Sequence, residues 1–268
     1  DADNVTLTAP TKPAWLSLTT NSGGDVTTIA GTGSSGSTDG NGTSASFYYP
    51  NGVAVDGSGN VYVADTYNHT IRKIATNGDV TTIAGTGSDG SIDGNGTSAS
   101  FNSPWGVAVD GSGNVYVADS GNHKIRKIAP NGDVTTVAGS SLSGSTDANG
   151  TSASFRSPTG LAIDGSGNVY VADAFNHKIR KIAPNGDVTT IAGSGSTGNT
   201  DGNGTSASFS SPWGIAVDVS GNVFVADQNN HSIRKIAPNG DVTTIAGTGS
   251  QGNTDGNGTS ASFNYPYG

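Results

Sequence analysis

The chain has 268 residues, of which 32% are hydrophobic, 12% are charged and 42 are glycine, and its formal net charge is −9. An acidic surface repels phosphate backbones, which argues against nucleic acid as a partner. No apolar run approaches the roughly 20 residues that a membrane-spanning helix needs, so no membrane span is expected.

Cysteine and methionine are both absent. Without cysteine there is no disulfide, no thiol nucleophile and no thiolate metal ligand. The sequence begins at Asp1 rather than at an initiator methionine, which we interpret as the removal of a signal peptide. Together with a composition rich in glycine, serine, threonine and asparagine, this predicts a secreted protein or one at a bacterial cell surface.

Residues 1–24 contain two short segments with strand-like alternation, Val5–Thr8 and Trp15–Leu18. Neither segment resembles the rest of the sequence. Residues 1–24 are therefore assigned to a separate N-terminal segment, and residues 25–268 to one repetitive domain. The apolar side chains with which this segment would pair are Val5, Leu7, Trp15, Leu16 and Leu18.

The domain is built on a 54-residue repeat, because its large apolar and proline landmarks recur at that spacing. The landmarks are Phe47, Phe101, Phe155, Phe209 and Phe263, with Pro50, Pro104, Pro158, Pro212 and Pro266. Residues 25–31 match only the last strand of a unit, and complete units cover residues 52–85, 106–139, 160–193 and 214–247. The sequence stops at Gly268, where the first strand of another unit is due.

Each unit predicts four short strands joined by tight turns, which form an antiparallel meander. In residues 106–139 the strands read GVAVD, NVYVAD, HKIRKI and DVTTVAG. The second strand is apolar on both sides, with Val115 and Val117 on one and Tyr116 and Ala118 on the other, so the sheet must be covered on both faces. Neighbouring blades of a β-propeller provide that cover, and the threonine-rich last strand suits a blade's outer edge.

A stretch rich in glycine and serine, such as Gly139 to Pro158, links each blade to the next. Its one large apolar residue is Phe155. Because long structureless loops are uncommon unless they are tied down, we expect this phenylalanine to pin the linker against the blade.

One motif, P-x-G-V-A-V-D-x-x-G-N-V-Y-V-A-D-x-x-N-H-x-I-R-K-I, recurs over Pro50–Ile74, Pro104–Ile128, Pro158–Ile182 and Pro212–Ile236. It resembles the NHL repeat. The resemblance implies an all-β fold, a β-propeller with four-stranded blades. The number of units predicts about five blades, of which the fifth is incomplete in the repeat sequence.

Two ways of completing the fifth blade remain open. The strands of residues 1–24 close it within the same chain, or one of them enters the unfinished blade of a neighbouring subunit. The second arrangement adds a strand to an open edge and, because it does not close on itself, produces a head-to-tail filament.

Four histidines occupy one equivalent position, and they are His69, His123, His177 and His231. A ring of histidines around a propeller axis would bind a metal, and the resemblance adds that NHL-like lyases use histidines in a central channel. Each histidine here lies in the ordinary N-H-x-I motif after a turn, which favours a structural role with local hydrogen bonds. No metal site is assigned to them.

An aspartate ends the second strand of each blade and an arginine follows seven residues later, as in Asp119 and Arg126. We expect a structural ion pair across the turn. Every blade repeats the same polar residues, so no singular acid–base or nucleophile set marks a catalytic centre. No catalytic residue is assigned, and we do not expect an enzyme.

The linkers carry a D-G-N-G-T pattern that places oxygen ligands at alternate positions, as some Ca²⁺ loops do. A plain turn explains it better, so no cofactor is expected and Ca²⁺ is the weaker alternative. The weak Ca²⁺ candidates are Asp39, Asn41, Asp93, Asn95, Asp201, Asn203, Asp255 and Asn257. The Asn-x-Ser/Thr pattern also makes glycosylation candidates of Asn4, Asn41, Asn68, Asn95, Asn149, Asn203, Asn230 and Asn257, although the composition alone produces some of these.

The turns DGSGN and PNGD barely change among the units, whereas two other segments vary. These are the loop after the second strand and the residues around the repeated proline, which a blade places on one face. Aromatic residues at these variable positions predict a binding face for sugar rings or for protein, unless the rings pack beneath the linkers. They are Tyr48, Tyr49, Tyr67, Trp105, Phe175, Trp213, Tyr265 and Tyr267.

These observations predict a non-enzymatic, extracellular structural or interaction module that assembles with itself through strand exchange of its termini. One alternative is a propeller that binds a glycan or a peptide through its aromatic face. A third is an NHL-like lyase with a metal in the channel.

Overall fold

The computed structural model describes residues 26–268. The predicted strands Val5–Thr8 and Trp15–Leu18, and with them the assembly residues Val5, Leu7, Trp15, Leu16 and Leu18, lie outside the described residues.

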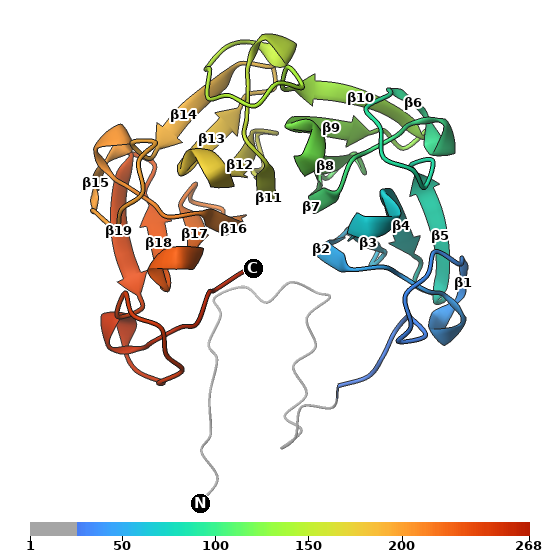
Figure 1. Ribbon diagram of the computed structural model, residues 1–268, viewed down its shortest axis with the longest axis horizontal. Helices are drawn as coiled ribbons and strands as arrows, with labels where there is room; N and C mark the ends of the chain where they lie inside the picture. Colours follow the sequence, from blue (N-terminus) through green and yellow to red (C-terminus); the bar gives the residue numbers. More distant parts are fainter. Residues whose placement is uncertain (1–25) are drawn as a thin grey trace, which may run out of the picture.

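Four antiparallel sheets stand around a common centre, each with its first strand innermost (Figure 1). Blade 1 contains β2 (Pro50–Val55), β3 (Val61–Asp65), β4 (Thr70–Ile74) and β5 (Asp79–Ala84). Blade 2 contains β7 (Pro104–Val109), β8 (Val115–Asp119), β9 (Lys124–Ile128) and β10 (Asp133–Ala138). Blade 3 contains β11 (Pro158–Ile163), β12 (Val169–Asp173), β13 (Lys178–Ile182) and β14 (Val188–Ala192), and blade 4 contains β16 (Pro212–Val217), β17 (Val223–Asp227), β18 (Ser232–Ile236) and β19 (Asp241–Ala246). The predicted all-β propeller with four-stranded blades is confirmed.

Short 3-10 turns mark two places in every unit. One set joins the second and third strands: η2 (Thr66–Asn68), η4 (Ser120–Asn122), η6 (Ala174–Asn176) and η8 (Gln228–Asn230). The other set lies in the linkers: η1 (Gly42–Ser44), η3 (Gly96–Ser98), η5 (Gly150–Ser152), η7 (Gly204–Ser206) and η9 (Gly258–Ser260). None of these helices, which are the helices of residues 26–268, has the length and hydrophobicity of a transmembrane segment.

The linkers are more ordered than their sequence predicts. Three of them contribute a two-residue strand, β1 (Gly40–Asn41), β6 (Gly94–Asn95) or β15 (Gly202–Asn203), to the outer strand of the following blade. Gly40 pairs with Val80 and Asn41 with Asp79, so the linker covers the beginning of β5. The threonine-rich strand is therefore a free edge only beyond that point, because the chain uses its own linker to protect it.

The apolar core lies between the blades. Val115 and Val117 pack with Ala64 and Ile71 of blade 1, while Ala118 on the other side of β8 belongs to the cluster shared with blade 3. The alternation predicted for the second strand is therefore confirmed. Three linker phenylalanines, Phe101, Phe155 and Phe209, each enter one such cluster and are fully buried.

A glycine in each inner strand allows the blades to approach one another at the centre. A Cβ atom on Gly52 would lie 2.5 Å from the carbonyl oxygen of Trp105, and one on Gly106 would collide with the carbonyl of Thr159. A side chain at these positions would push the inner strands apart, so glycine is required there for a steric reason.

The ring formed by residues 26–268 is open between blade 4 and blade 1 (Figure 1). The described residues contain the four complete blades that the repeat units predict. The completion of a fifth blade by residues 1–24, in the same chain or between chains, stays a prediction because that segment lies outside the described part.

Removal of a linker phenylalanine tests whether these rings hold the blades together. We expect Phe155→Ala to lower the free energy of unfolding by about 3–5 kcal/mol, because it leaves a cavity between blades 2 and 3. Phe47 is the matched control, since it occupies the same repeat position but remains partly exposed beside the opening. Urea unfolding should show less than half of that loss for Phe47→Ala. Equal losses would contradict the role of the ring as an inter-blade wedge.

Candidate functional site

The two variable segments of each blade lie together at the same end of the sheet. The backbone N–H of Tyr67, in η2, donates to the carbonyl of Tyr48 at 3.1 Å, and that of Phe175 donates to the carbonyl of Arg156 at 3.3 Å. Equivalent bonds join Gly121 to Asn102 and Asn229 to Ser210. The loop after the second strand and the entry to the first strand therefore form one surface, as the sequence comparison among units predicts.

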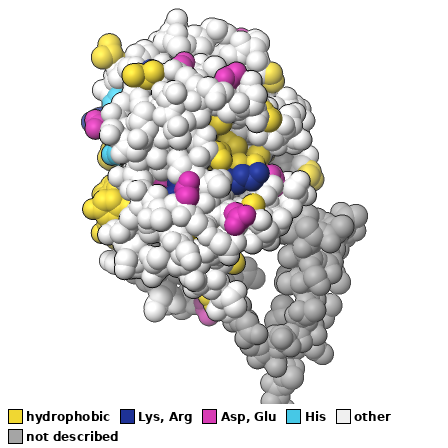
Figure 2. All heavy atoms as spheres, turned by 90° about the vertical axis from the view of Figure 1, so that its right-hand side faces the viewer, with side chains coloured by type: hydrophobic (Ala, Val, Ile, Leu, Met, Phe, Trp, Pro, Cys, Tyr) yellow, Lys and Arg dark blue, Asp and Glu magenta, His cyan; other side chains and the backbone are white. Residues whose placement is uncertain are grey.

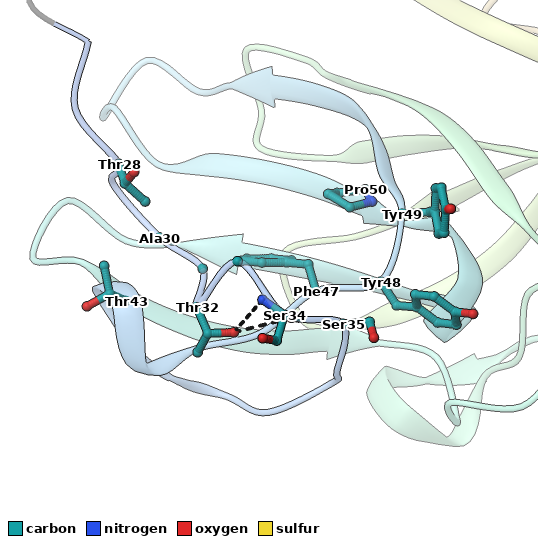
Figure 3. Close-up of a pocket in the computed structure, with 12 residues that line it drawn as sticks. Thr28, Ala30, Thr32, Ser34, Ser35, Thr43, Phe47, Tyr48, Tyr49 and Pro50 are labelled. Atoms are coloured by element: carbon teal, nitrogen blue, oxygen red, sulfur yellow. Dashed lines mark hydrogen bonds between the residues drawn. The ribbon is translucent and has the colours of Figure 1, made fainter.

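Blade 1 carries three clustered tyrosines on this surface. The ring centroid of Tyr67 lies 5.3 Å from that of Tyr48 and 4.8 Å from that of Tyr49. Their relative exposures are 49%, 40% and 64%, so the rings do not pack beneath a linker. Tyr48 and Tyr49 also border a hollow of about 1040 Å³ beside the first linker (Figure 3).

A second aromatic cluster lies where the inner strands meet. The Trp213 ring is 5.3 Å from Trp105 and stacks on Tyr267 at 5.0 Å. These three rings line a cavity of about 270 Å³ together with Asn51 and Thr159. The Nε1 atom of Trp213 is buried against the neighbouring rings.

The remaining two predicted face residues belong to neither cluster. Phe175 is 46% exposed, and Tyr265 packs edge-on against His231 with centroids 4.6 Å apart. The eight predicted residues thus form two aromatic clusters and two separate rings. In the side view, hydrophobic side chains gather along one edge of the molecule near histidines, while most of the visible surface is uncharged (Figure 2).

The four histidines connect each blade to the linker that follows it. Every one has left-handed backbone geometry, with φ between 50° and 56°. The Nδ1 atom of His69 accepts a hydrogen bond from the backbone N–H of Ser103 at 3.0 Å, and His123 does the same with Ser157 at 3.1 Å. Their structural role therefore uses a partner 34 residues away rather than a local one. Within residues 26–268, no group of three or more histidine or acidic side chains is arranged to hold a metal ion.

The arginine of the third strand makes at least four hydrogen bonds in each unit. Arg126 donates from Nη1 to Asp119 Oδ2 at 2.8 Å and to the Ser100 carbonyl at 3.1 Å. Its Nη2 atom donates to the Ile92 carbonyl at 3.0 Å and to Asp93 Oδ1 at 2.6 Å. Since Ser100, Ile92 and Asp93 belong to the linker, one guanidinium group fixes the linker to the blade.

This arrangement recurs in all four blades. The predicted Asp–Arg pairs are present as Asp65–Arg72, Asp119–Arg126, Asp173–Arg180 and Asp227–Arg234, and both side chains of each pair are fully buried. Each guanidinium also lies over the linker phenylalanine, at 5.0 or 5.1 Å from the ring centroid. Burial raises the pKa of Asp119, Asp173 and Asp227, in opposition to the hydrogen bonds that they accept.

The carboxylates of the D-G-N-G-T loops are engaged with the protein itself. Asp39 accepts hydrogen bonds from Arg72 at 2.7 Å and from the backbone and hydroxyl of Thr82 at 3.0 Å. Burial acts to raise the pKa of Asp39, but the bonds from Thr82 and Arg72 outweigh it and lower the pKa below 3.8. Asp93 and Asp201 are held in the same way, so a Ca²⁺ ion would have to compete with an arginine at these three candidates.

The asparagines of these loops are also hydrogen-bonded. Asn41 donates from Nδ2 to the Asn77 carbonyl and to Asp79 Oδ1, and the equivalent bonds exist for Asn95, Asn149 and Asn203. Asn68 and Asn230 donate to the aspartate of their own blade. A sugar on any of these nitrogens would displace a bond, whereas Asn257 is exposed and Asn4 lies outside the described residues.

The family pattern for the NHL repeat matches residues 47–74, 101–128, 155–182 and 209–236. Each match begins at the linker phenylalanine and ends with the third strand, so it contains the buried Asp–Arg pair, such as Asp119 and Arg126, but not the linker aspartate, such as Asp93. The chain belongs to the NHL-repeat family. The resemblance identified from the sequence is thereby confirmed.

Two curated relatives share this domain. The chain is 32% identical to the Arabidopsis thaliana protein SUPPRESSOR OF QUENCHING 1, chloroplastic, with 90% of this chain and 24% of that protein covered. It is 31% identical to the NHL repeat-containing protein 2 of Bos taurus, with 87% and 37% covered. The chain therefore spans only a quarter to two fifths of the length of these relatives.

Solved structures of similar fold have different activities or none assigned. A structural genomics protein of unknown function from Bacteroides thetaiotaomicron matches with a TM-score of 0.55 and 26% identity, over 90% of this chain and 69% of that one. A streptogramin B lyase matches with a TM-score of 0.52 and 14% identity, over 78% and 57%. The second likeness extends to the fold alone.

The linker aspartate can be tested against a natural control in the same chain. We expect Asp93→Ala to cost about 1–2 kcal/mol of unfolding free energy, since it removes the bonds to Arg126 and Thr136. Asp255 occupies the same repeat position, but no arginine pairs with it among residues 26–268. Asp255→Ala should therefore change the stability by less than about 0.5 kcal/mol in the same urea titration. A comparable loss for both variants would show that the pairing of Asp93 with Arg126 contributes little to stability.

The histidine contacts predict a dependence of stability on pH. Burial, with the nearby charge of Arg156, lowers the pKa of His123 and of His177 below 6.5. Because the folded pKa lies below the unfolded one, the stabilisation is complete above about pH 6.5 and is lost as the pH falls below it. Protonation also removes the Nδ1 acceptor that Ser157 uses.

We expect the melting temperature to fall between pH 7 and pH 5, and to fall less in the double variant His123→Asn/His177→Asn. Asparagine adopts left-handed geometry readily and offers an oxygen acceptor at a similar place. Thermal melts across this pH range provide the measurement. Parallel curves for the two proteins would exclude these histidines as the cause.

Proposed function

We propose that the protein is a non-enzymatic, extracellular interaction module that binds its partner through the aromatic face. The exposed tyrosine cluster of blade 1 is the observation that carries this proposal. Three rings that contact one another and remain 40–64% exposed form the kind of rigid aromatic surface that protein interfaces use as an anchor. The polar residues that recur in every blade bind one another in the arginine–aspartate pairs that hold the linkers to the blades. This use supports a scaffold rather than a catalyst.

The tyrosine cluster is tested by substitution with the residue that blade 4 uses at two of the same positions, Ser210 and Ser211. Peptide ligands are selected from a displayed library on the intact protein, and their affinities are then measured for the variant Tyr48→Ser/Tyr49→Ser/Tyr67→Ser. We expect at least a tenfold loss of affinity, about 1.4 kcal/mol, because aromatic anchors dominate such interfaces. Leu142→Ser is the control for an exposed apolar residue outside the predicted face and should leave affinity unchanged. Ligands that bind all three proteins equally would refute the proposal.

A carbohydrate ligand is a second candidate. It is favoured by the second aromatic cluster, which consists of Trp105, Trp213 and Tyr267. Sugar rings stack on aromatic faces, and the Trp213 and Tyr267 rings line the cavity of about 270 Å³. The sequence contains three tryptophans, so the variant Trp15→Phe retains only Trp105 and Trp213 as tryptophan fluorophores. Titration with soluble oligosaccharides should change the fluorescence of this variant. Fluorescence that stays constant across the titration would contradict a carbohydrate ligand at these rings.

Self-assembly through strand exchange remains a prediction. Its donor strands lie in residues 1–24, outside the described part of the chain. The lyase alternative also stays a prediction.

A further inference from the structure

A hollow lies between blades 1 and 2, apart from both aromatic clusters. Its volume is about 300 Å³, which is at the lower end of the range for pockets that hold small molecules. Blade 1 lines it with Tyr62, Lys73 and Ile83, and blade 2 lines it with Val115, Ile128 and the turn of residues 129–132. That turn joins β9 to β10, at the end of the sheet opposite the variable loops. The hollow is therefore separate from the aromatic face.

The walls of this hollow are the outer end of the apolar core between the two blades. Tyr62, Val115 and Ile128 belong to one buried cluster and are 7%, 2% and 3% exposed, and Ile83 packs against that cluster. The side view, which faces these two blades, shows hydrophobic side chains within a hollow and a basic side chain at its edge (Figure 2). Apolar walls that face a hollow lack dispersion contacts, which an apolar ligand would restore.

Lys73 adds a positive charge to these apolar walls. The residue is half-buried and pairs with Tyr62 across β3 and β4, and its Nζ atom lies 5.9 Å from the centroid of the Tyr62 ring. All eight ion pairs of residues 26–268 belong to arginines, so the Lys73 ammonium has no carboxylate partner in that part of the chain. An ammonium group beside an apolar hollow favours an anionic ligand over a neutral one.

The other polar side chains around the hollow are bound within the protein. The Tyr62 hydroxyl donates to Asp56 Oδ2 at 3.1 Å, and Asp56 also accepts from the backbone N–H groups of Ser58 and Asn60. The Asn131 side chain donates to Asp133 Oδ2 at 2.8 Å and accepts from the backbone N–H of the same residue. Among the side chains that line the hollow, Lys73 is therefore the one whose polar group can hold a ligand.

We propose that this hollow binds a small hydrophobic carboxylic acid in its ionised form. The carboxylate pairs with the ammonium of Lys73, while the hydrocarbon part lies against Ile83, Val115 and Ile128. One lysine balances the single charge of a carboxylate, whereas a phosphate monoester brings about two negative charges at neutral pH. The charge therefore favours a carboxylate over a phosphate, and the walls favour a ligand with an apolar body.

Isothermal titration calorimetry on the intact chain tests this site with matched probes. Phenylacetate carries both recognised groups, phenylacetamide lacks the charge, acetate lacks the apolar body, and phenyl phosphate carries the wrong anion. Lys73→Met removes the charge, and Ile83→Trp fills the hollow. Lys124→Met is the matched control, because it removes the same charge from blade 2 at a side chain that donates to Ser91 Oγ at 2.8 Å and does not line the hollow.

We expect phenylacetate to bind at least about fivefold more tightly than phenylacetamide and phenyl phosphate, and at least about tenfold more tightly than acetate. Lys73→Met should abolish the preference for phenylacetate over phenylacetamide, Ile83→Trp should weaken the binding of both, and Lys124→Met should change neither. Methionine keeps an unbranched apolar stem at position 73, so Lys73→Met retains the fold even where Ile83→Trp does not.

Three results overturn the proposal: phenylacetate binds no more tightly than phenylacetamide, the preference for phenylacetate survives in Lys73→Met, or phenyl phosphate binds more tightly than phenylacetate. A folded Ile83→Trp variant with unchanged affinity for phenylacetate equally overturns it, because the ligand then lies elsewhere. None of these outcomes involves the aromatic face, so the proposed function is tested separately.

Discussion

A buried guanidinium group organises each unit of this propeller. Arg126 has no exposed side-chain surface, and its charge is balanced by one aspartate in its own blade and by another in the linker. Leaving a charge of this kind without partners inside a protein would cost several kcal/mol, so the linker must fold back to supply its carbonyl oxygens and its carboxylate. The course of the linker is therefore dictated by the arginine.

The position of the linker in turn creates the core between the blades. The residue after Ser100, whose carbonyl accepts from Arg126, is Phe101, and its ring lies beneath the guanidinium at 5.1 Å. From there the ring packs against the apolar faces of blades 1 and 2. The ion pairs of Arg126 and the packing of the Phe101 ring thus depend on one another. A propeller with only 32% hydrophobic residues can then assemble its core from small side chains around a few large rings.

The buried arginines and their aspartate partners lie in the linkers and the blade interiors. The loops at one end of the sheets can therefore vary without loss of the fold. Blade 1 uses that freedom for the cluster of Tyr48, Tyr49 and Tyr67, whereas blade 4 has Ser210, Ser211 and Asn229 at the same positions. Because the backbone bonds between the two variable segments persist in all four blades, the frame of this surface stays constant while its side chains change. This separation between a fixed frame and variable loops is what a binding module requires.

The sequence was sufficient for the parts of the structure in which partners lie close along the chain. The repeat spacing predicted the blades, the alternation at Val115 to Ala118 predicted the two buried faces, and the seven-residue spacing predicted the pair of Asp119 and Arg126. The partner of Asp93 was not predicted, because Arg126 lies 33 residues away across an irregular linker. The contact of His69 with Ser103 was missed for the same reason, since a backbone donor carries no signature in the sequence.

The most direct test of the account is a double-mutant cycle on the buried pair. Asp119→Ala and Arg126→Met should each lower the free energy of unfolding by about 3–5 kcal/mol, because each leaves one charge buried without its partner. The double variant, measured by urea unfolding, should cost at least about 1 kcal/mol less than the sum of the two single losses, since it leaves no such charge on this pair. Losses that add to within about 0.5 kcal/mol would mean that the two groups act independently, and that the guanidinium does not organise the unit.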